Sequence, residues 1–146
     1  MATKQAIALN RRLLQELARE RVRDAKALLQ YCRYAAAYYL CGYAVECALK
    51  ACIAKATNKH DFPDLEAARA VHTHNLEQLL GSAGLKSALD NARRADNSLD
   101  VNWSIVVGWK ETNRYRTGIS KQQAHELYQA ITDRGNGVLK WVKTFW

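Results

Sequence analysis

The sequence predicts a single all-α domain, and three observations support this fold class. Pro63 is the only proline and there are seven glycines, so long stretches carry no helix breaker. Those stretches are rich in Ala, Leu, Arg, Lys, Gln and Glu, the residues that favour helices. With 146 residues, 49% of them hydrophobic and 25% charged, the chain has the size and composition of a soluble globular protein with one core. We therefore expect one domain over residues 1–146.

The spacing of apolar residues predicts two long helices in the first part of the chain. Within residues 14–29, apolar positions recur at three- and four-residue steps with charged residues between them, which indicates an amphipathic helix. Within residues 34–56, nearly every position is apolar on all sides, which is typical of a helix at the centre of a bundle. Glu46 and Lys50 are the only charges in residues 34–54, and their i, i+4 spacing allows them to pair.

Turn residues divide the remainder into shorter elements. Residues 57–71, with Pro63 and several polar side chains, are expected to form a loop with room for one short helix. The β-branched run in residues 100–107 fits a strand or a buried helical turn, and a helix is expected because no second convincing strand is present to pair with it. Ser120 and Gln123 have the spacing of a capping box, which opens a helix. Further helices are expected over residues 75–80, 85–95, 120–132 and 138–146, with a polar loop over residues 113–118.

Neither export nor membrane insertion is expected from the sequence. The first residues lead into a charged helix and not into an apolar signal region, so we expect a cytoplasmic protein. The most apolar run, residues 35–45, is far shorter than the roughly 20 residues of a membrane-spanning helix. We therefore expect no contact with a membrane.

Four cysteines lie in one segment without C-x-x-C spacing. On one helix they project in several directions and do not bridge one another easily, so we expect buried reduced thiols. His72 and His74 offer two imidazoles, but no further ligand stands beside them at a suitable spacing, which makes metal binding the lesser alternative. We expect neither a metal nor a cofactor. The cysteines are Cys32, Cys41, Cys47 and Cys52.

The net charge of +8 is unevenly distributed along the chain. Residues 1–33 hold eight Lys or Arg against three acids, residues 34–100 hold seven against eight, and residues 101–146 hold seven against three. Basic ends suit a polyanionic partner, because neutralising phosphates releases counterions and gives affinity that is independent of sequence. A solvated basic surface without a ligand is the alternative interpretation.

Several segments resemble the HEPN family of prokaryotic helical proteins. Residues 24–29 (DAKALL), followed by residues 37–51 (AYYLCGYAVECALKA), look like the signature of that family. Residues 74–85 resemble the next helix of the family, and residues 103–115 resemble its arginine-containing segment. The resemblance implies a four- or five-helix up-and-down bundle that commonly forms a homodimer. The sequence agrees independently, because Gly42 and the surrounding alanines allow close helix approach.

HEPN ribonucleases carry an arginine followed four to six residues later by a histidine. Such a pair suits metal-independent RNA cleavage, because imidazole moves the proton of the 2′-hydroxyl while guanidinium holds the phosphate. The equivalent arginine here is Arg114, but the next histidine, His125, lies eleven positions on. Arg69 and His74 have the spacing, although Ala70 stands where a polar residue usually follows the arginine. We therefore expect no catalysis, with Arg69 and His74 as the catalytic alternative.

A basic and aromatic segment is the candidate binding site. Its mixture of cations and rings is able to grip phosphates and stack on bases, and the residues are Trp109, Lys110, Asn113, Arg114, Tyr115 and Arg116. The alternative interpretation places Trp109 and Tyr115 in the core. If Glu46 faces this segment, an ion pair with Arg114 accounts for the buried charge.

These observations favour a dimeric HEPN-like module that binds RNA or nucleotides without cutting them. The resemblance implies a nucleotidyltransferase or a toxin–antitoxin protein as its partner. Two alternatives stay open: a metal-independent endoribonuclease, and a module whose only ligand is another protein.

Overall fold

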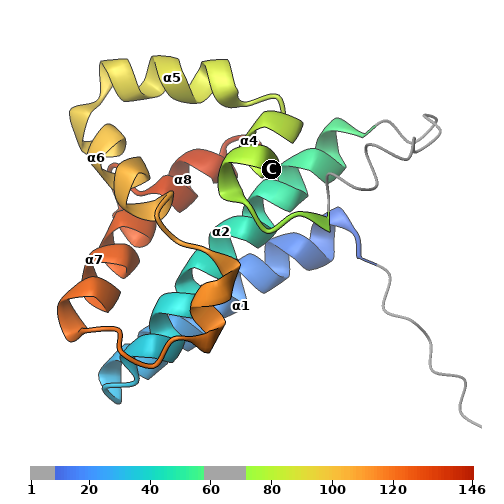
Figure 1. The fold of residues 1–146 in the computed structure, drawn as a ribbon. Coiled ribbons are helices and arrows are strands. Elements are labelled where there is room, and N and C mark those ends of the chain that lie inside the picture. Colours follow the sequence, from blue (N-terminus) through green and yellow to red (C-terminus); the bar gives the residue numbers. More distant parts are fainter. Residues whose placement is uncertain (1–8, 58–71) are drawn as a thin grey trace, which may run out of the picture.

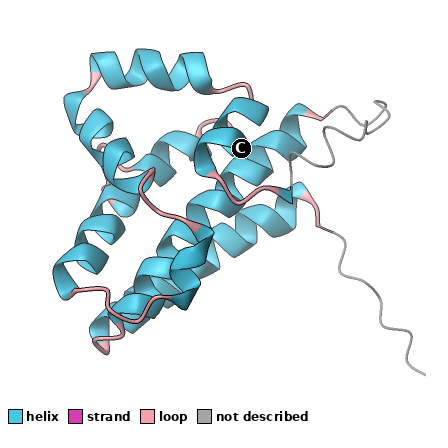
Figure 2. Ribbon diagram, viewed as in Figure 1, coloured by secondary structure: helices cyan, strands magenta, loops and turns pink. Residues whose placement is uncertain are grey.

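The computed structural model describes residues 9–57 and 72–146, and this part of the chain is all-α, without a β-strand (Figures 1 and 2). The expected fold class is therefore confirmed. The described residues form seven α-helices and one 3₁₀ helix, more than the four or five expected, because turns divide the second half into short helices. The elements are α1 (Arg11–Gln30), α2 (Tyr34–Ala56), α4 (Leu76–Ser82), α5 (Lys86–Ala95), α6 (Asn97–Val106), η1 (Glu111–Tyr115), α7 (Lys121–Thr132) and α8 (Val138–Lys143).

The first two helices form an antiparallel pair that runs the length of the molecule (Figure 1). Helix α1 buries the apolar stripe predicted from its spacing, and it ends in a Schellman motif. In that motif the Arg33 N–H donates to the carbonyl of Leu28 at 2.8 Å, and the Cys32 N–H donates to that of Leu29 at 3.1 Å. Cys32 has a φ of 59°, the left-handed conformation that this motif requires. The chain reverses there, and Arg33 caps the start of α2.

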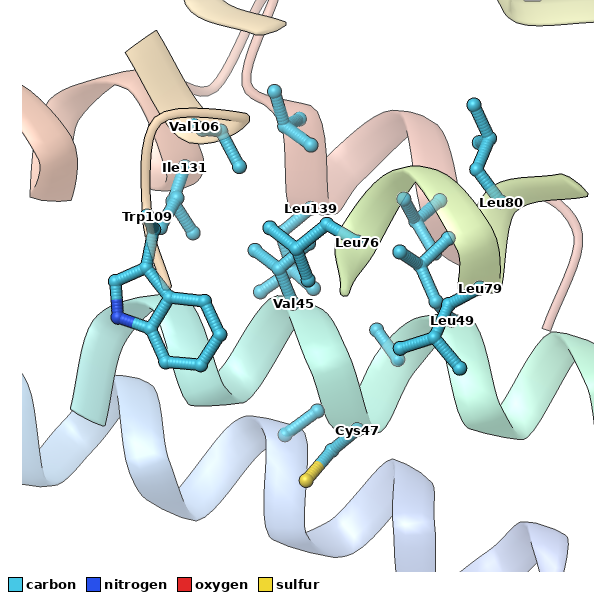
Figure 3. Close-up of a cluster of buried hydrophobic side chains, with 14 of the residues drawn as sticks. Val45, Cys47, Leu49, Leu76, Leu79, Leu80, Val106, Trp109, Ile131 and Leu139 are labelled. Carbon is cyan, nitrogen blue, oxygen red and sulfur yellow. The ribbon is translucent and has the colours of Figure 1, made fainter. Parts of the chain in front are cut away.

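Helix α2 is the centre of the fold. It contacts α1, α4, α7, α8 and η1, and its buried residues lie on every side, as its apolar sequence predicts. Figure 3 shows Leu49 of α2 facing Leu79 of α4, whereas Cys47 points toward α1. The side chains of Leu49, Leu79 and Cys47 are no more than 1% exposed.

Capping side chains set the starts of the shorter helices. The Asn75 side chain accepts the N–H of Gln78 at 3.0 Å to open α4, and the Asp96 carboxylate accepts two N–H groups at the start of α6. Ser120 and Gln123 form the predicted capping box of α7. Residues 97–106, which include most of the ambiguous β-branched run, are helical. The expected loop over residues 57–71 lies outside the described residues, except for Thr57.

The segment expected to be a polar loop over residues 113–118 begins inside a 3₁₀ helix, η1. Its first turn closes because the Lys110 N–H donates to the Asn113 side-chain oxygen at 2.7 Å and the Asn113 N–H donates to the Lys110 carbonyl at 2.9 Å. An asparagine that serves as both donor and acceptor across one turn can replace a conventional cap. The local bonding forms a 3₁₀ helix over residues 111–115, whereas residues 116–118 have no regular structure, as the polar sequence predicts.

Three of the four cysteines are buried free thiols, as expected: Cys41, Cys47 and Cys52. Burial raises the pKa of Cys47 and of Cys52 to about 11, which keeps these thiols protonated and unreactive. Cys32 contradicts the expectation, because the turn between α1 and α2 exposes it. No helix among the described residues is long and apolar enough to cross a membrane.

Candidate anion-binding site

The structure divides the six residues of the predicted binding segment. Trp109 is 2% exposed and Asn113 is 7% exposed, so neither ring stacking on a base nor side-chain recognition of a ligand is open to them. Asn113 holds the first turn of η1, as described above. The exposed members are Lys110, Arg114, Tyr115 and Arg116.

Trp109 anchors the segment to the central helix. Its ring stacks on Tyr39 with 6.0 Å between centroids, and it lies against Gly42, where a Cβ atom would come within 2.3 Å of three ring atoms. Figure 3 shows the indole descending from the end of α6 onto α2. The glycine expected to allow close approach therefore admits an indole ring and not a second helix. This contact fixes where η1 begins.

Arg114 is held within its own segment. Its guanidinium forms an ion pair with Glu111, donates to the Tyr115 hydroxyl at 2.7 Å, and lies 4.7 Å above the centre of that ring. The bond to the Tyr115 hydroxyl, followed by the charge of Glu111, raises the pKa of Arg114 above its ordinary value. Arg114 does not pair with Glu46, the arrangement considered for the case that Glu46 faces this segment; Glu111 lies one turn from Arg114 and takes its charge.

A cavity of about 550 Å³ lies between the turn after α1, the first turn of α2 and the segment that follows η1. We call it the arginine cavity. Three arginines line it, Arg33, Arg114 and Arg116, and no acidic residue does. Neither Arg33 nor Arg116 forms an ion pair with any described residue. The remaining lining residues are Cys32, Tyr34, Ala35, Ala36, Tyr39, Thr117 and Ile119.

The start of α2 adds to the positive potential of this cavity. Tyr34, Ala35 and Ala36 form its first turn, and all three line the cavity. The capping residue, Arg33, makes no side-chain hydrogen bond to that turn, and no acidic residue stands in it. The first N–H groups of a helix lack partners within the helix and carry the positive end of its dipole. The arginines and the helix dipole thus both favour the binding of an anion in this cavity.

Two tyrosines supply neutral donors at the wall. A side-chain hydrogen bond with Cys32, followed by burial, raises the pKa of Tyr34, and burial raises that of Tyr39 although Arg114 opposes it. Both hydroxyls therefore stay protonated at neutral pH and are able to donate hydrogen bonds. Their rings offer apolar faces beside the charged groups.

A second group of charges surrounds Glu46, the one fully buried carboxylate of the described residues. Its Oε1 atom lies 2.9 Å from Lys50 Nζ, so the predicted i, i+4 pair is confirmed, and 2.7 Å from His74 Nδ1. Because Glu46 is paired with a lysine, it accepts, and His74 Nδ1 donates the proton. The His74 side chain is 47% exposed, and its Nε2 lies 4.0 Å from Glu111 Oε1.

His74 lies at the surface, one of the two roles, surface or capping, that the sequence predicts for it. Asn75, and not His74, caps α4. His74 lines a cavity of about 410 Å³ that Lys110, Glu111 and Trp109 also line. This second cavity is lined by both a cation, Lys110, and an acid, Glu111. Arg69, the other half of the catalytic alternative, lies outside the described residues.

Sequence reasoning missed Arg33, Tyr34 and Tyr39 as site residues. Arg33 gave one signal in the sequence. A cation just before the first turn of a helix is unfavourable, because it lies beside the positive end of the helix dipole, so its presence calls for an explanation. The two tyrosines gave none, because they stand in a run of apolar residues that predicts a helix at the centre of a bundle. Only the fold brings that run beside Arg114 and Arg116.

No model of a known protein family, no curated protein and no solved structure matches this chain.

Proposed function

We propose that this chain is a HEPN-like, dimeric helical module that binds RNA or nucleotides without cutting them, beside a nucleotidyltransferase or toxin–antitoxin partner. The observation that carries the proposal is the arginine cavity. Three arginines and the start of α2 line the same cavity, and no acidic residue lines it. Converging cations beside tyrosine rings are the groups that bind phosphate and stack against a base.

The structure also favours arginine over a general basic surface as the source of affinity. Arg33 and Arg116 keep their charges available, since neither is engaged in an ion pair with a described residue. Guanidinium binds phosphate in a planar, bidentate manner that a scattered lysine surface does not offer. Phosphate affinity should therefore depend on these two residues more than on cations elsewhere.

The test is a titration of a fluorescent single-stranded RNA at several salt concentrations. Arg33→Ala with Arg116→Ala should weaken binding and reduce the slope of log affinity against log salt by up to about two. The matched control is Arg12→Ala with Arg134→Ala, which removes the same charge from exposed positions outside the cavity. Equal losses in both double variants, or no RNA binding by the unaltered protein, would overturn the proposal.

A metal-independent endoribonuclease is the second candidate, and the hydrogen bond between His74 and Glu46 favours it. A carboxylate that fixes one imidazole nitrogen leaves the other to take a proton, as a general base does. An RNA ladder incubated with and without divalent metal separates the two functions. We expect no cleavage, because the next histidine after Arg114 in the sequence is His125, eleven positions on, and Glu111 already takes the charge of Arg114. Cleavage that disappears in both Arg69→Ala and His74→Ala would establish the enzyme instead.

A further inference from the structure

We propose that the arginine cavity selects a terminal phosphomonoester, at an RNA end or on a free nucleotide, over the phosphodiesters inside a strand. This inference rests on the proposed function, since it assigns a ligand class to the same site. Charge, hydrogen-bond donors and size each support it.

The charge of the cavity matches a dianion. A phosphomonoester carries about −1.5 to −2 charges at pH 7, whereas each internal phosphodiester carries one. The cavity brings together guanidinium groups from three separate parts of the chain, the turn before α2, η1 and the segment after η1. Of the three arginines that line the cavity, only Arg114 has a carboxylate partner among the described residues. Two uncompensated guanidiniums remain, and they balance a phosphomonoester.

The donors of the cavity also match a terminal group. A phosphomonoester offers three terminal oxygens as acceptors. The first turn of α2 lines the cavity with Tyr34, Ala35 and Ala36, a helix start that has no side-chain cap. The N–H groups of a helix start and the guanidiniums together reach acceptors from more than one side. An internal phosphodiester exposes two such oxygens, and its chain continues in both directions.

The size of the cavity fits one nucleotide better than a strand. Its volume of about 550 Å³ lies within the roughly 300 to 1,000 Å³ of cavities that enclose a single small ligand. Proteins that bind single strands without regard to their ends use grooves that span about 4 to 16 nucleotides. Tyr34 and Tyr39 stand at the wall. The Tyr39 ring stacks on Tyr43 and Trp109, which leaves the Tyr34 ring to meet the base or ribose of the terminal nucleotide.

The experiment compares four RNAs of one sequence, each with an internal fluorophore. One has hydroxyls at both ends, one carries a 5′-phosphate, one carries a 3′-phosphate, and one carries a 5′-phosphate methyl ester. The methyl ester matters because it keeps the size of the phosphate while reducing it to a singly charged diester. We expect at least one phosphorylated RNA to bind about tenfold more tightly than the hydroxyl form, and the methyl ester to bind like the hydroxyl form. Adenosine monophosphate as competitor shows whether a free nucleotide suffices.

Variants connect this preference to the cavity. Arg33→Ala with Arg116→Ala should abolish the preference, and Arg12→Ala with Arg134→Ala should retain it. The pair Arg33→Lys and Arg116→Lys keeps the charge but loses bidentate geometry, so it should retain general RNA affinity and lose most of the preference. Circular dichroism establishes that each variant is folded.

The outcomes separate this inference from the proposed function. If all four RNAs bind equally well and lose affinity together in the alanine pair, RNA binding at the cavity stands and the selection of ends is refuted. If none of the RNAs binds, both fail. Competition by adenosine monophosphate together with a preference for a phosphorylated end supports the phosphomonoester and identifies the free nucleotide as a sufficient ligand.

Discussion

Replacing Gly42 by alanine should destabilise the protein and disturb the arginine cavity at the same time. A Cβ atom at this position of α2 would lie 2.3 Å from the Cδ1, Cγ and Nε1 atoms of Trp109. Ordinary van der Waals contact begins at about 3.4 Å, so the ring would need to move by 3.4 − 2.3, or about 1.1 Å. The ring is 2% exposed and stacked on Tyr39, which leaves it little room.

The size of the effect follows from two opposing contributions. Overfilling a packed core costs about 1 to 3 kcal/mol, and a rigid indole in the core places this case near 3 kcal/mol. Alanine gains about 1 kcal/mol over glycine inside a helix. The difference, about 3 minus about 1, predicts that the free energy of unfolding falls by about 2 kcal/mol.

Urea unfolding followed by circular dichroism measures this change, and Gly81→Ala is the matched control. Gly81 lies within α4, is exposed, and has no atom within 4 Å of a built Cβ. Alanine there should raise the free energy of unfolding by up to about 1 kcal/mol. The reasoning is refuted if Gly42→Ala proves as stable as the unaltered protein, or if both substitutions shift stability in the same direction.

The same substitution should weaken RNA binding. Trp109 precedes η1 by two positions, so a displaced ring shifts the start of η1 and with it Arg114 and Arg116. Folded Gly42→Ala protein should therefore bind the phosphorylated RNA less tightly, with no change of charge. Full affinity in a folded variant would show that the cavity does not depend on this contact.

Three further predictions concern buried charge, pH and assembly. Glu46→Ala should lower the free energy of unfolding by about 3 kcal/mol, because Lys50 is 13% exposed and loses its carboxylate partner. Adding Lys50→Met to Glu46→Ala should recover part of that loss, and urea unfolding of the single and double variants measures both changes. Hydrogen bonds from the Asn136 side chain and the Leu99 N–H lower the pKa of Asp96 below 3.8, so its stabilisation is present above that pH and is lost as the pH falls through the lowered value. Asn136→Ala should flatten the acid limb of a plot of unfolding midpoint against pH, and an unchanged limb contradicts the assignment. Light scattering after size exclusion should give twice 16.5 kDa for the proposed dimer, whereas 16.5 kDa at every concentration excludes it.

The parts of the fold that the sequence predicts well are those set by local spacing. The bounds of α2 and the capping box of α7 depend on neighbours within a few residues, and both agree with the structure. The pairing of Glu46 with Lys50 is local in the same way. The contact between Glu46 and His74 joins residues 28 positions apart, and no pattern within one helix predicts it.

The candidate site was harder to predict because it brings together two segments that lie far apart in the sequence. Arg33 reaches the cavity through a Schellman turn that holds Cys32 at a φ of 59°, and a cysteine at that position gives no sequence signal of a left-handed residue. Arg114 and Arg116 reach the cavity through η1 and the segment after it, a helix formed where the polar sequence predicted a loop. The cations were visible in the sequence, and their convergence was not.

Trp109 shows how one residue links the predicted segment with the site that the fold builds. From the sequence it was a candidate to stack on a base, because a tryptophan among cations suits that role. In the structure the indole is buried against Gly42, and the exposed groups on its C-terminal side are the ones left to meet a ligand. The ring lies two positions before η1, and η1 carries Arg114, which lines the same cavity as Arg33. If the cavity binds phosphate as proposed, Trp109 acts through its position and not through contact with the ligand, and its removal should cost affinity.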